Sequence, residues 1–164
     1  MPAKSVVQAK EPNRSAGQHS IEQVVDLLGG PRVLGRRISS KLDVHEAITN
    51  GIPGGALVHM VSHVRTLKPD DVSRAVGVSL RTVQRRTNAP RSRLSQEQSG
   101  RTWKFAEILA KATDVFGDQT EAENWLTRPA MALDDRRPAD LLSSPVGVEM
   151  VEQLLGRLEH GVYT

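Results

Sequence analysis

The chain has 164 residues, with 22 Lys and Arg against 19 Asp and Glu, a formal net charge of +3 and no cysteine. The absence of cysteine excludes disulfides, thiolate nucleophiles and Cys-ligated zinc, and it fits a reducing, cytoplasmic location. The sequence contains no run of about 18 apolar residues, so it predicts no membrane span. At roughly 150 residues per domain, the length predicts one domain or two small domains that share a core.

The N-terminal part is polar and then becomes periodic. Residues 1–19 contain too few apolar side chains to offset the entropy of ordering and lack the apolar segment of a secretory signal, so we expect a flexible arm. Ser20 is a predicted N-cap, with Gln23 as its capping-box partner, and the helix that follows ends at the Gly-Gly-Pro sequence at 29–31. Two further helices are predicted over residues 44–50, with Asp43 as the cap, and over residues 53–64.

The C-terminal half contains the longest periodic segment. Apolar side chains recur at intervals of three and four over residues 100–116, which predicts a helix that Gly117 ends. A short helix to Leu126 follows, with Thr120 as its predicted N-cap and Glu123 as the capping-box partner. More helical segments are predicted over residues 138–142 and 145–159. Because no segment alternates with period two, the sequence predicts an all-α fold.

The strongest local pattern lies in residues 69–86. Pro69 suits the first turn of a helix, and Gly77 can adopt the left-handed conformation of a tight turn between helices. Val78 is placed to fill the angle between the helices, and Ser79 to cap the second one. These features predict a helix-turn-helix, whose second helix enters the DNA major groove. Any two-helix corner with a glycine turn shares the spacing, so the charge of the segment has to support the interpretation.

The second helix of this motif presents polar and basic side chains to the outside. Arginine pairs with guanine, glutamine with adenine, and serine and threonine with phosphates or bases. Arg86 occupies a position where many such helices bury an aliphatic residue, so either its stem lies along the surface or Leu80 supplies the packing. We expect DNA contacts from Ser79, Arg81, Thr82, Gln84, Arg85 and Arg86.

The small net charge conceals three regions. Residues 1–60 carry 7 basic and 5 acidic side chains, residues 61–104 carry 10 and 3, and residues 105–164 carry 5 and 11. The strongly basic middle region favours binding to a polyanion, because cations that neutralise phosphates release condensed counterions. We therefore predict a DNA-binding domain over residues 20–104 and a second helical domain over residues 105–164.

The motif resembles the helix-turn-helix of the Xre/MbcA/ParS antitoxin family. That family carries the pattern Gly-[Val/Ile]-Ser-x-Arg-Thr-x-x-Arg-Arg, and this chain has Gly77-Val78-Ser79-Leu80-Arg81-Thr82-Val83-Gln84-Arg85-Arg86. The C-terminal region also resembles the family's toxin-binding domain. The residues that carry this second resemblance are Trp125-Leu126 before Pro129, Ala132-Leu133, Pro138-x-x-Leu141-Leu142, Gly147, Val151, Leu154-Leu155, Leu158-Glu159 and Gly161-Val162.

The resemblance implies an antitoxin encoded beside a RES-type toxin, whose fold is related to ADP-ribosyltransferases and which consumes NAD. In such families the C-terminal portion of the antitoxin covers the active site of the toxin. The antitoxin and toxin together repress their shared operon. The partners that the resemblance implies are therefore a cognate RES-type toxin and operator DNA.

The acidic C-terminal region contains residues suited to such an inhibitor. A toxin pocket that holds the pyrophosphate of NAD should be electropositive, and residues 105–164 carry a net charge of −6. We expect acidic toxin contacts and one aromatic anchor. These contacts are expected from Glu149, Glu152, Glu159, Tyr163 and the terminal carboxylate of Thr164.

Other groups of polar residues are explained better by a structural role than by a metal or catalytic site. His59 and His63 are four residues apart, but no third ligand is evident, so we expect a surface or interface pair and no metal site. The sequence shows no pairing of a nucleophile with a base, no set of metal ligands and no cofactor-binding loop, so we expect neither an enzyme nor a bound cofactor.

The alternative function is a stand-alone transcriptional regulator whose C-terminal helices dimerise or sense a ligand. Both functions predict a homodimer, since helix-turn-helix proteins usually bind two half-sites, and we expect helix 100–116 or helix 145–159 to contribute to a protein interface.

Overall fold

The computed structural model describes residues 16–161, with side chains from Ser20 onward. Within this range the chain forms ten α-helices, one 3-10 helix and no β-strand, which confirms the all-α prediction. Of the predicted arm, residues 1–15 lie outside the described range. The elements are α1 (Ala16–Leu27), α2 (Gly30–Leu34), α3 (Lys41–Asn50), α4 (Gly54–His63), α5 (Pro69–Val76), α6 (Leu80–Asn88), α7 (Gln96–Phe116), α8 (Gln119–Thr127), η1 (Met131–Leu133), α9 (Pro138–Leu141) and α10 (Pro145–Glu159).

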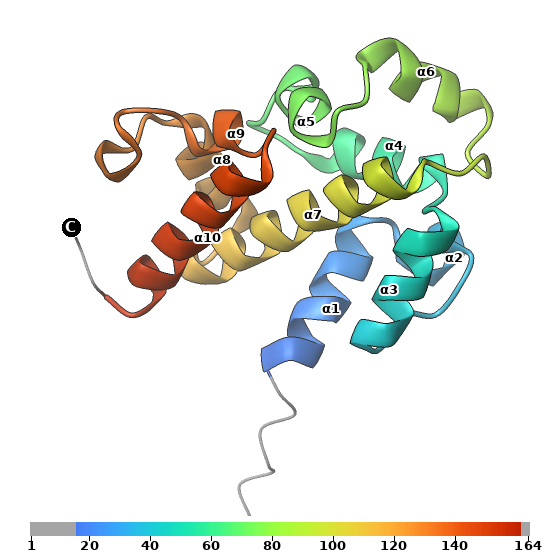
Figure 1. Ribbon diagram of the computed structural model, residues 1–164, viewed down its shortest axis with the longest axis horizontal. Helices are drawn as coiled ribbons and strands as arrows, with labels where there is room; N and C mark the ends of the chain where they lie inside the picture. The colour runs from blue at the N-terminus through green and yellow to red at the C-terminus, as the bar shows by residue number, and fades with distance from the viewer. Residues whose placement is uncertain (1–15, 162–164) are drawn as a thin grey trace, which may run out of the picture.

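Helix α7 crosses the molecule, and helices from both ends of the chain pack against it (Figure 1). It contacts α1, α3, α5, α8 and α10, and its buried side chains include Trp103, Phe105 and Leu109. The predicted domain boundary between residues 104 and 105 falls in the middle of this uninterrupted helix. Buried apolar side chains on both sides of that boundary belong to one cluster, so the two predicted regions share one core.

Two predicted helix starts in the N-terminal half are wrong by several residues. α1 begins at Ala16, so Ser20 lies inside the helix and does not cap it. α3 begins after Ser40, whose hydroxyl accepts a hydrogen bond from the Asp43 backbone at 3.1 Å, while the Asp43 carboxylate accepts one from the Ser40 backbone at 3.0 Å. Asp43 is therefore the third residue of a capping box and not the cap. A polar first turn precedes the apolar run in both helices, which explains the error.

The starts of α7 and α8 show the same displacement. α7 is capped by Ser95 and gains a first turn before the predicted start at residue 100. α8 is capped by Asp118, and Thr120 lies within the helix. Glu123 makes no capping box with Thr120, because its carboxylate is turned toward the interior of the molecule. Among the helices of residues 16–161, none is both long and apolar enough to cross a membrane.

Candidate nucleic-acid and toxin interfaces

The predicted helix-turn-helix is formed by α5 and α6. Gly77 ends α5 with φ 70° and ψ 31°, the left-handed conformation that any other residue would adopt at a cost. Val78 is 2% exposed in the angle between the helices, and its carbonyl accepts a hydrogen bond from the buried hydroxyl of Ser73. Ser79 caps α6 by accepting a hydrogen bond from the Thr82 backbone at 3.2 Å. The turn therefore has the geometry that its sequence predicts.

The outer face of α6 is polar and basic. Val83 is the residue that this helix buries, at 7% exposure, while Arg81, Gln84 and Arg85 are exposed. Arg85 donates a hydrogen bond to the half-buried Thr82 hydroxyl at 3.3 Å. Among residues 16–161, neither Arg81 nor Gln84 has a side-chain hydrogen bond or an ion pair. These side chains are thus available to a ligand that approaches α6 from outside.

Arg86 lies differently from the other predicted DNA contacts. Its stem packs on α4, where a Cβ added to Gly54 would lie 2.7 Å from Arg86 Cδ. Its guanidinium donates a hydrogen bond to the Ser92 hydroxyl. Leu80 is 37% exposed and does not replace this packing. Of the two alternatives for Arg86, the one with its stem along the protein surface is confirmed, whereas its contact with DNA stays a prediction.

A buried carboxylate ties α5 to the C-terminal region. Asp71 is 4% exposed, and its Oδ1 accepts hydrogen bonds from Arg137 and Arg74, both at 2.8 Å. Arg137 also donates two hydrogen bonds to Asp140, at 2.7 and 2.9 Å. Burial raises the pKa of Asp71, but hydrogen bonds from Arg137, the Lys68 backbone and Arg74 outweigh it, so the pKa lies below its ordinary value. The first helix of the DNA-binding motif is thus anchored by charge to α9.

Glu123 makes a second buried link, from α8. Its Oε2 accepts hydrogen bonds from the backbone N–H groups of Arg65 at 2.7 Å, Thr66 at 2.6 Å and Leu67 at 3.1 Å. Its Oε1 accepts one from the Gln119 amide at 2.7 Å. A fully buried carboxylate needs several hydrogen-bond partners. Here it also supplies the acceptor for backbone N–H groups of the connection that leads into α5. In the sequence, Glu123 falls on the apolar side of a short helix, and this placement is the signal that could have identified it as a buried carboxylate.

Arg101 connects the helix-turn-helix to the C-terminal region a third time. One guanidinium nitrogen donates a hydrogen bond to the Ser143 carbonyl at 2.5 Å, in the connection between α9 and α10. The other lies against the α5–α6 turn, where a Cβ added to Gly77 would clash with it. The positive φ of Gly77 is the stronger reason for glycine here, because the arginine tip could move aside. The two functional regions meet at this arginine.

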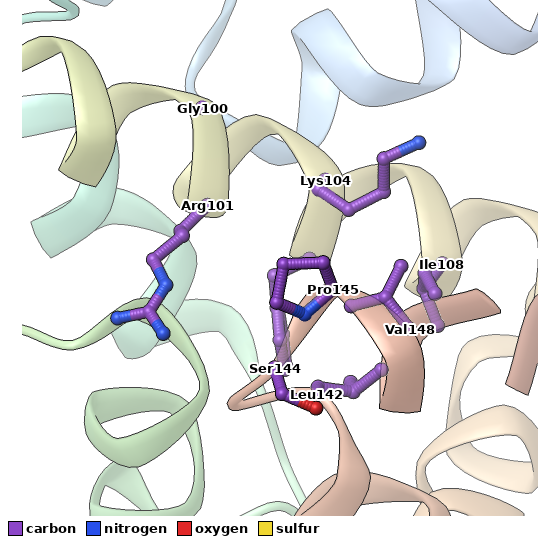
Figure 2. A pocket seen from close by; sticks show the side chains of 9 residues that line it. Gly100, Arg101, Lys104, Ile108, Leu142, Ser144, Pro145 and Val148 are labelled. Atoms are coloured by element: carbon purple, nitrogen blue, oxygen red, sulfur yellow. The ribbon is translucent and has the colours of Figure 1, made fainter. Parts of the chain in front are cut away.

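A hollow of about 300 Å³ opens beside Arg101, between α7 and the start of α10 (Figure 2). Leu142, Pro145 and Val148 form part of its apolar lining. Arg101 and Lys104 stand at its rim, and Figure 2 shows their side chains directed away from the apolar centre. The hollow thus combines an apolar centre with basic side chains at its rim.

Helix α10 buries one side against α7 and presents the other to solvent. Glu149 and Glu159 are exposed, while Glu152 is half-buried and accepts a hydrogen bond from Lys104 at 3.1 Å. Burial disfavours the charge on Lys104, but its hydrogen bonds to Glu107 and Glu152 outweigh this and raise the pKa of Lys104. Glu152 is thus less available to a partner than Glu149 or Glu159. The remaining predicted toxin contacts, Tyr163 and Thr164, lie outside the described residues.

The histidine pair forms a stacked arrangement. The ring centroids of His59 and His63 are 3.9 Å apart, and their Nδ1 atoms lie 3.2 Å from the Leu27 carbonyl and 2.8 Å from the His59 carbonyl, respectively. Among residues 16–161 there is no group of three or more side chains placed to hold a metal ion. His59 thus contacts the end of α1, whereas the exposed His63 bonds within α4.

Known antitoxins match both regions of the chain. The model described as the antitoxin Xre-like helix-turn-helix domain matches residues 43–107, and the one described as the antitoxin Xre/MbcA/ParS C-terminal toxin-binding domain matches residues 111–161. The chain is 30% identical to the antitoxin Xre of Yersinia enterocolitica over 137 residues, which are 81% of this chain and 92% of that protein. The chain belongs to the Xre/MbcA/ParS family of antitoxins.

Two further relatives of the antitoxin extend the comparison. The antitoxin Xre of Photorhabdus laumondii is 28% identical over 132 residues, covering 80% of this chain and 88% of that protein. The antitoxin Xre of Pseudomonas putida is 29% identical over 124 residues, covering 76% of each chain. The antitoxin thus matches its relatives over most of their length, and the family is one of antitoxins and not of enzymes.

The two matches coincide with the two surfaces of the antitoxin. The helix-turn-helix match contains α5 and α6 and ends within α7, where the toxin-binding match begins. The antitoxin therefore has a DNA-binding domain and a toxin-binding domain joined along one helix. The toxin-binding match argues against a stand-alone regulator. Helices α1 and α2 precede both matches.

Proposed function

We propose that the antitoxin neutralises a RES-type, NAD-consuming toxin by covering its active site, and that the complex represses the shared operon through α6. The observation that carries this proposal is the separation of charge about α7. Arg81 and Arg85 are exposed on α6, and Glu149 and Glu159 are exposed on α10. One chain can therefore bind a polyanion and an electropositive protein pocket at the same time.

The character of α10 supports its role in contacting the toxin. Glu149 and Glu159 are exposed on this helix, and so are two apolar side chains four residues apart, Val146 and Met150. An apolar pair beside carboxylates is typical of an interface that combines burial with electrostatic complementarity. α7, the other helix considered for a protein interface, is enclosed by helices of its own chain. We therefore assign the toxin interface to α10 and the residues that follow it.

The proposal for DNA includes a homodimer. A single recognition helix contacts only one half-site, and two half-sites about one helical turn apart give repressors of this kind their affinity and specificity. Arg81, Gln84 and Arg85 would read base edges in the major groove, while Ser79 and Thr82 contact phosphates or bases. The toxin complex bound to the operator would thus carry at least two copies of the antitoxin.

Coexpression with the product of the adjacent reading frame tests the proposal. We expect the two proteins to copurify as a complex whose mass gives the stoichiometry, and we expect the antitoxin to restore the NAD content of cells that express the partner. A second measurement removes Gly161 to Thr164, which should weaken neutralisation if this end covers the active site. A partner that does not consume NAD would contradict the RES assignment, and unaltered neutralisation by the truncated chain would contradict occlusion by the C-terminus.

A further inference from the structure

Arg91 and Arg93, near α6, differ from the basic residues that are held by carboxylates of the same chain. Arg74, Lys104 and Arg137 each pair with at least two carboxylates. Among residues 16–161, no carboxylate forms an ion pair with Arg91 or Arg93, which follow α6 in the chain. Both side chains are exposed, and Arg93 donates one hydrogen bond to the Gly51 carbonyl at 2.8 Å, so both can still contact an anion from outside.

The backbone that carries these two arginines is fixed. The connection from α6 to α7 runs beside the chain that leads into α4: the Gly54 backbone donates to the Ser92 carbonyl at 2.8 Å, Gly55 to Pro90 at 2.9 Å, and Leu94 to the Ile52 carbonyl at 2.9 Å. In Figure 1 this connection descends from the end of α6 toward α3. Arg91 and Arg93 are therefore held in place beside the recognition helix.

The same surface continues into a part of the chain that precedes the helix-turn-helix match. Arg93 and Arg36 line one open hollow, together with Gly35 and Asn50. Arg36 belongs to the connection between α2 and α3 and is half-buried, with an ion pair to Glu46 at 2.9 Å. Arg36 and Arg93, from two distant segments, therefore meet at this hollow, and Arg91 lies in the short connection between α6 and Arg93.

We propose that Arg36, Arg91 and Arg93 form a phosphate-binding ridge that holds the DNA backbone beside the groove entered by α6. The occupant is the DNA backbone because the connection that carries Arg91 and Arg93 directly follows the DNA-binding helix and because phosphates flank the major groove on either side. Contacts of this kind position a protein on the duplex and carry no sequence information. The segment before the family's helix-turn-helix thereby becomes part of the DNA interface.

Glu46 limits the strength of the ridge. Its carboxylate neutralises Arg36 and repels phosphate at the same place, and it is itself exposed. Replacing it by glutamine removes the negative charge and keeps a side chain of the same size. The ridge therefore predicts a variant that binds DNA more tightly than the natural chain, which is a result that damage to the fold would not produce.

The test measures binding of the full-length antitoxin to two duplexes of equal length, one from the region upstream of its gene and one with that sequence shuffled. We expect Arg91→Gln with Arg93→Gln to weaken binding to both duplexes by the same factor. Because this variant neutralises two fewer phosphates, the fall in affinity between about 50 and 200 mM salt should become roughly tenfold smaller. Glu46→Gln should strengthen binding to both duplexes. Arg81→Ala should instead weaken the upstream duplex more than the shuffled one.

The matched control is Arg128→Gln with Arg157→Gln, which removes the same charge from exposed positions of the toxin-binding domain. This variant should keep the salt dependence of the natural chain. Equal salt dependence in the ridge variant and the control would overturn the ridge, and so would unchanged binding by Glu46→Gln. The ridge rests on DNA binding by α6, which the natural chain tests separately: no salt-dependent binding to either duplex would overturn DNA binding and the ridge together.

Discussion

Helices α6 and α10 are the two faces that this antitoxin offers to its partners, and they are held in different ways. α6 has nine residues and buries only Val83, so its position comes from its cap, its turn and the stem of Arg86 on α4. α10 has fifteen residues and buries four of them, three of which belong to the shared core. A short helix that gives nearly all of its surface to a ligand depends on its neighbours for its placement. A longer one can supply its own packing and still present a polar face.

The difference extends to charge. On α6 and the connection after it the arginines lack carboxylate partners within the described part of the chain, whereas Glu152 of α10 is paired with Lys104. An unpaired cation suits a phosphate, which supplies the counter-charge itself. A paired carboxylate suits a protein partner less well, since binding must first replace Lys104. We therefore expect binding through α6 to depend on salt more steeply than binding through α10.

The largest effect on the link between the two regions is expected from Glu123→Ala. This change leaves three backbone N–H groups of the α4–α5 connection without their acceptor in a buried place. We expect the free energy of unfolding to fall by about 3 kcal/mol, as measured by urea denaturation. Glu121→Ala, on the exposed side of the same helix, should change it by no more than about 0.5 kcal/mol. Equal effects of the two changes would show that the buried carboxylate contributes nothing.

A smaller effect is expected from Arg81→Ala on DNA binding. A bidentate contact with guanine contributes about 1–3 kcal/mol of discrimination, so affinity for the operator should fall between about fivefold and 150-fold. Fluorescence anisotropy with a labelled duplex measures it. The unfolding transition should not move, because Arg81 is exposed and has no side-chain partner among residues 16–161. A change in stability with unchanged DNA affinity would assign Arg81 to structure.

The smallest effect is expected from Arg137→Ala, which removes one partner of Asp71 and leaves Arg74 in place. We expect a loss of about 1–2 kcal/mol at neutral pH. The pKa of Asp71 lies below its ordinary 3.8 in the folded chain, so this carboxylate stabilises the fold above that value and ceases to do so as the pH falls through its folded pKa. Without Arg137 the pKa moves back toward 3.8, and stability should depend less on pH in that acidic range. An unchanged acid profile would contradict the role of the pair.

The motif was predictable from the sequence because its parts are local. Gly77, Val78 and Ser79 act through their own backbone conformations and neighbours, so the order of residues already specifies the turn. Helix starts were less predictable, because a serine or aspartate two to five residues earlier satisfied the same capping pattern. In α3, Asp43 was expected to be the cap and is instead the third residue of the helix. In α8, Glu123 was expected to pair with a cap at Thr120, but the cap is Asp118.

The links between the regions were not predictable from local patterns. Glu123 contacts residues 56 to 58 positions away, and Arg137 reaches Asp71 across 66 positions. Only the packed fold brings these groups together. The helical periodicity that identified α7 gave no indication that one helix would carry both regions, although the sharing of a core was one of the two options left open by the chain length.

The separation of DNA binding from toxin binding is tested most directly by one double variant, Arg81→Ala with Arg85→Ala, measured in two assays. Both side chains are exposed on α6, while Glu149 and Glu159, the exposed carboxylates that we expect to contact the toxin, lie on α10. We predict that binding to the operator is abolished while neutralisation of the cognate toxin in cells keeps the strength of the natural chain. Loss of neutralisation by this variant, with the fold intact, would contradict the account.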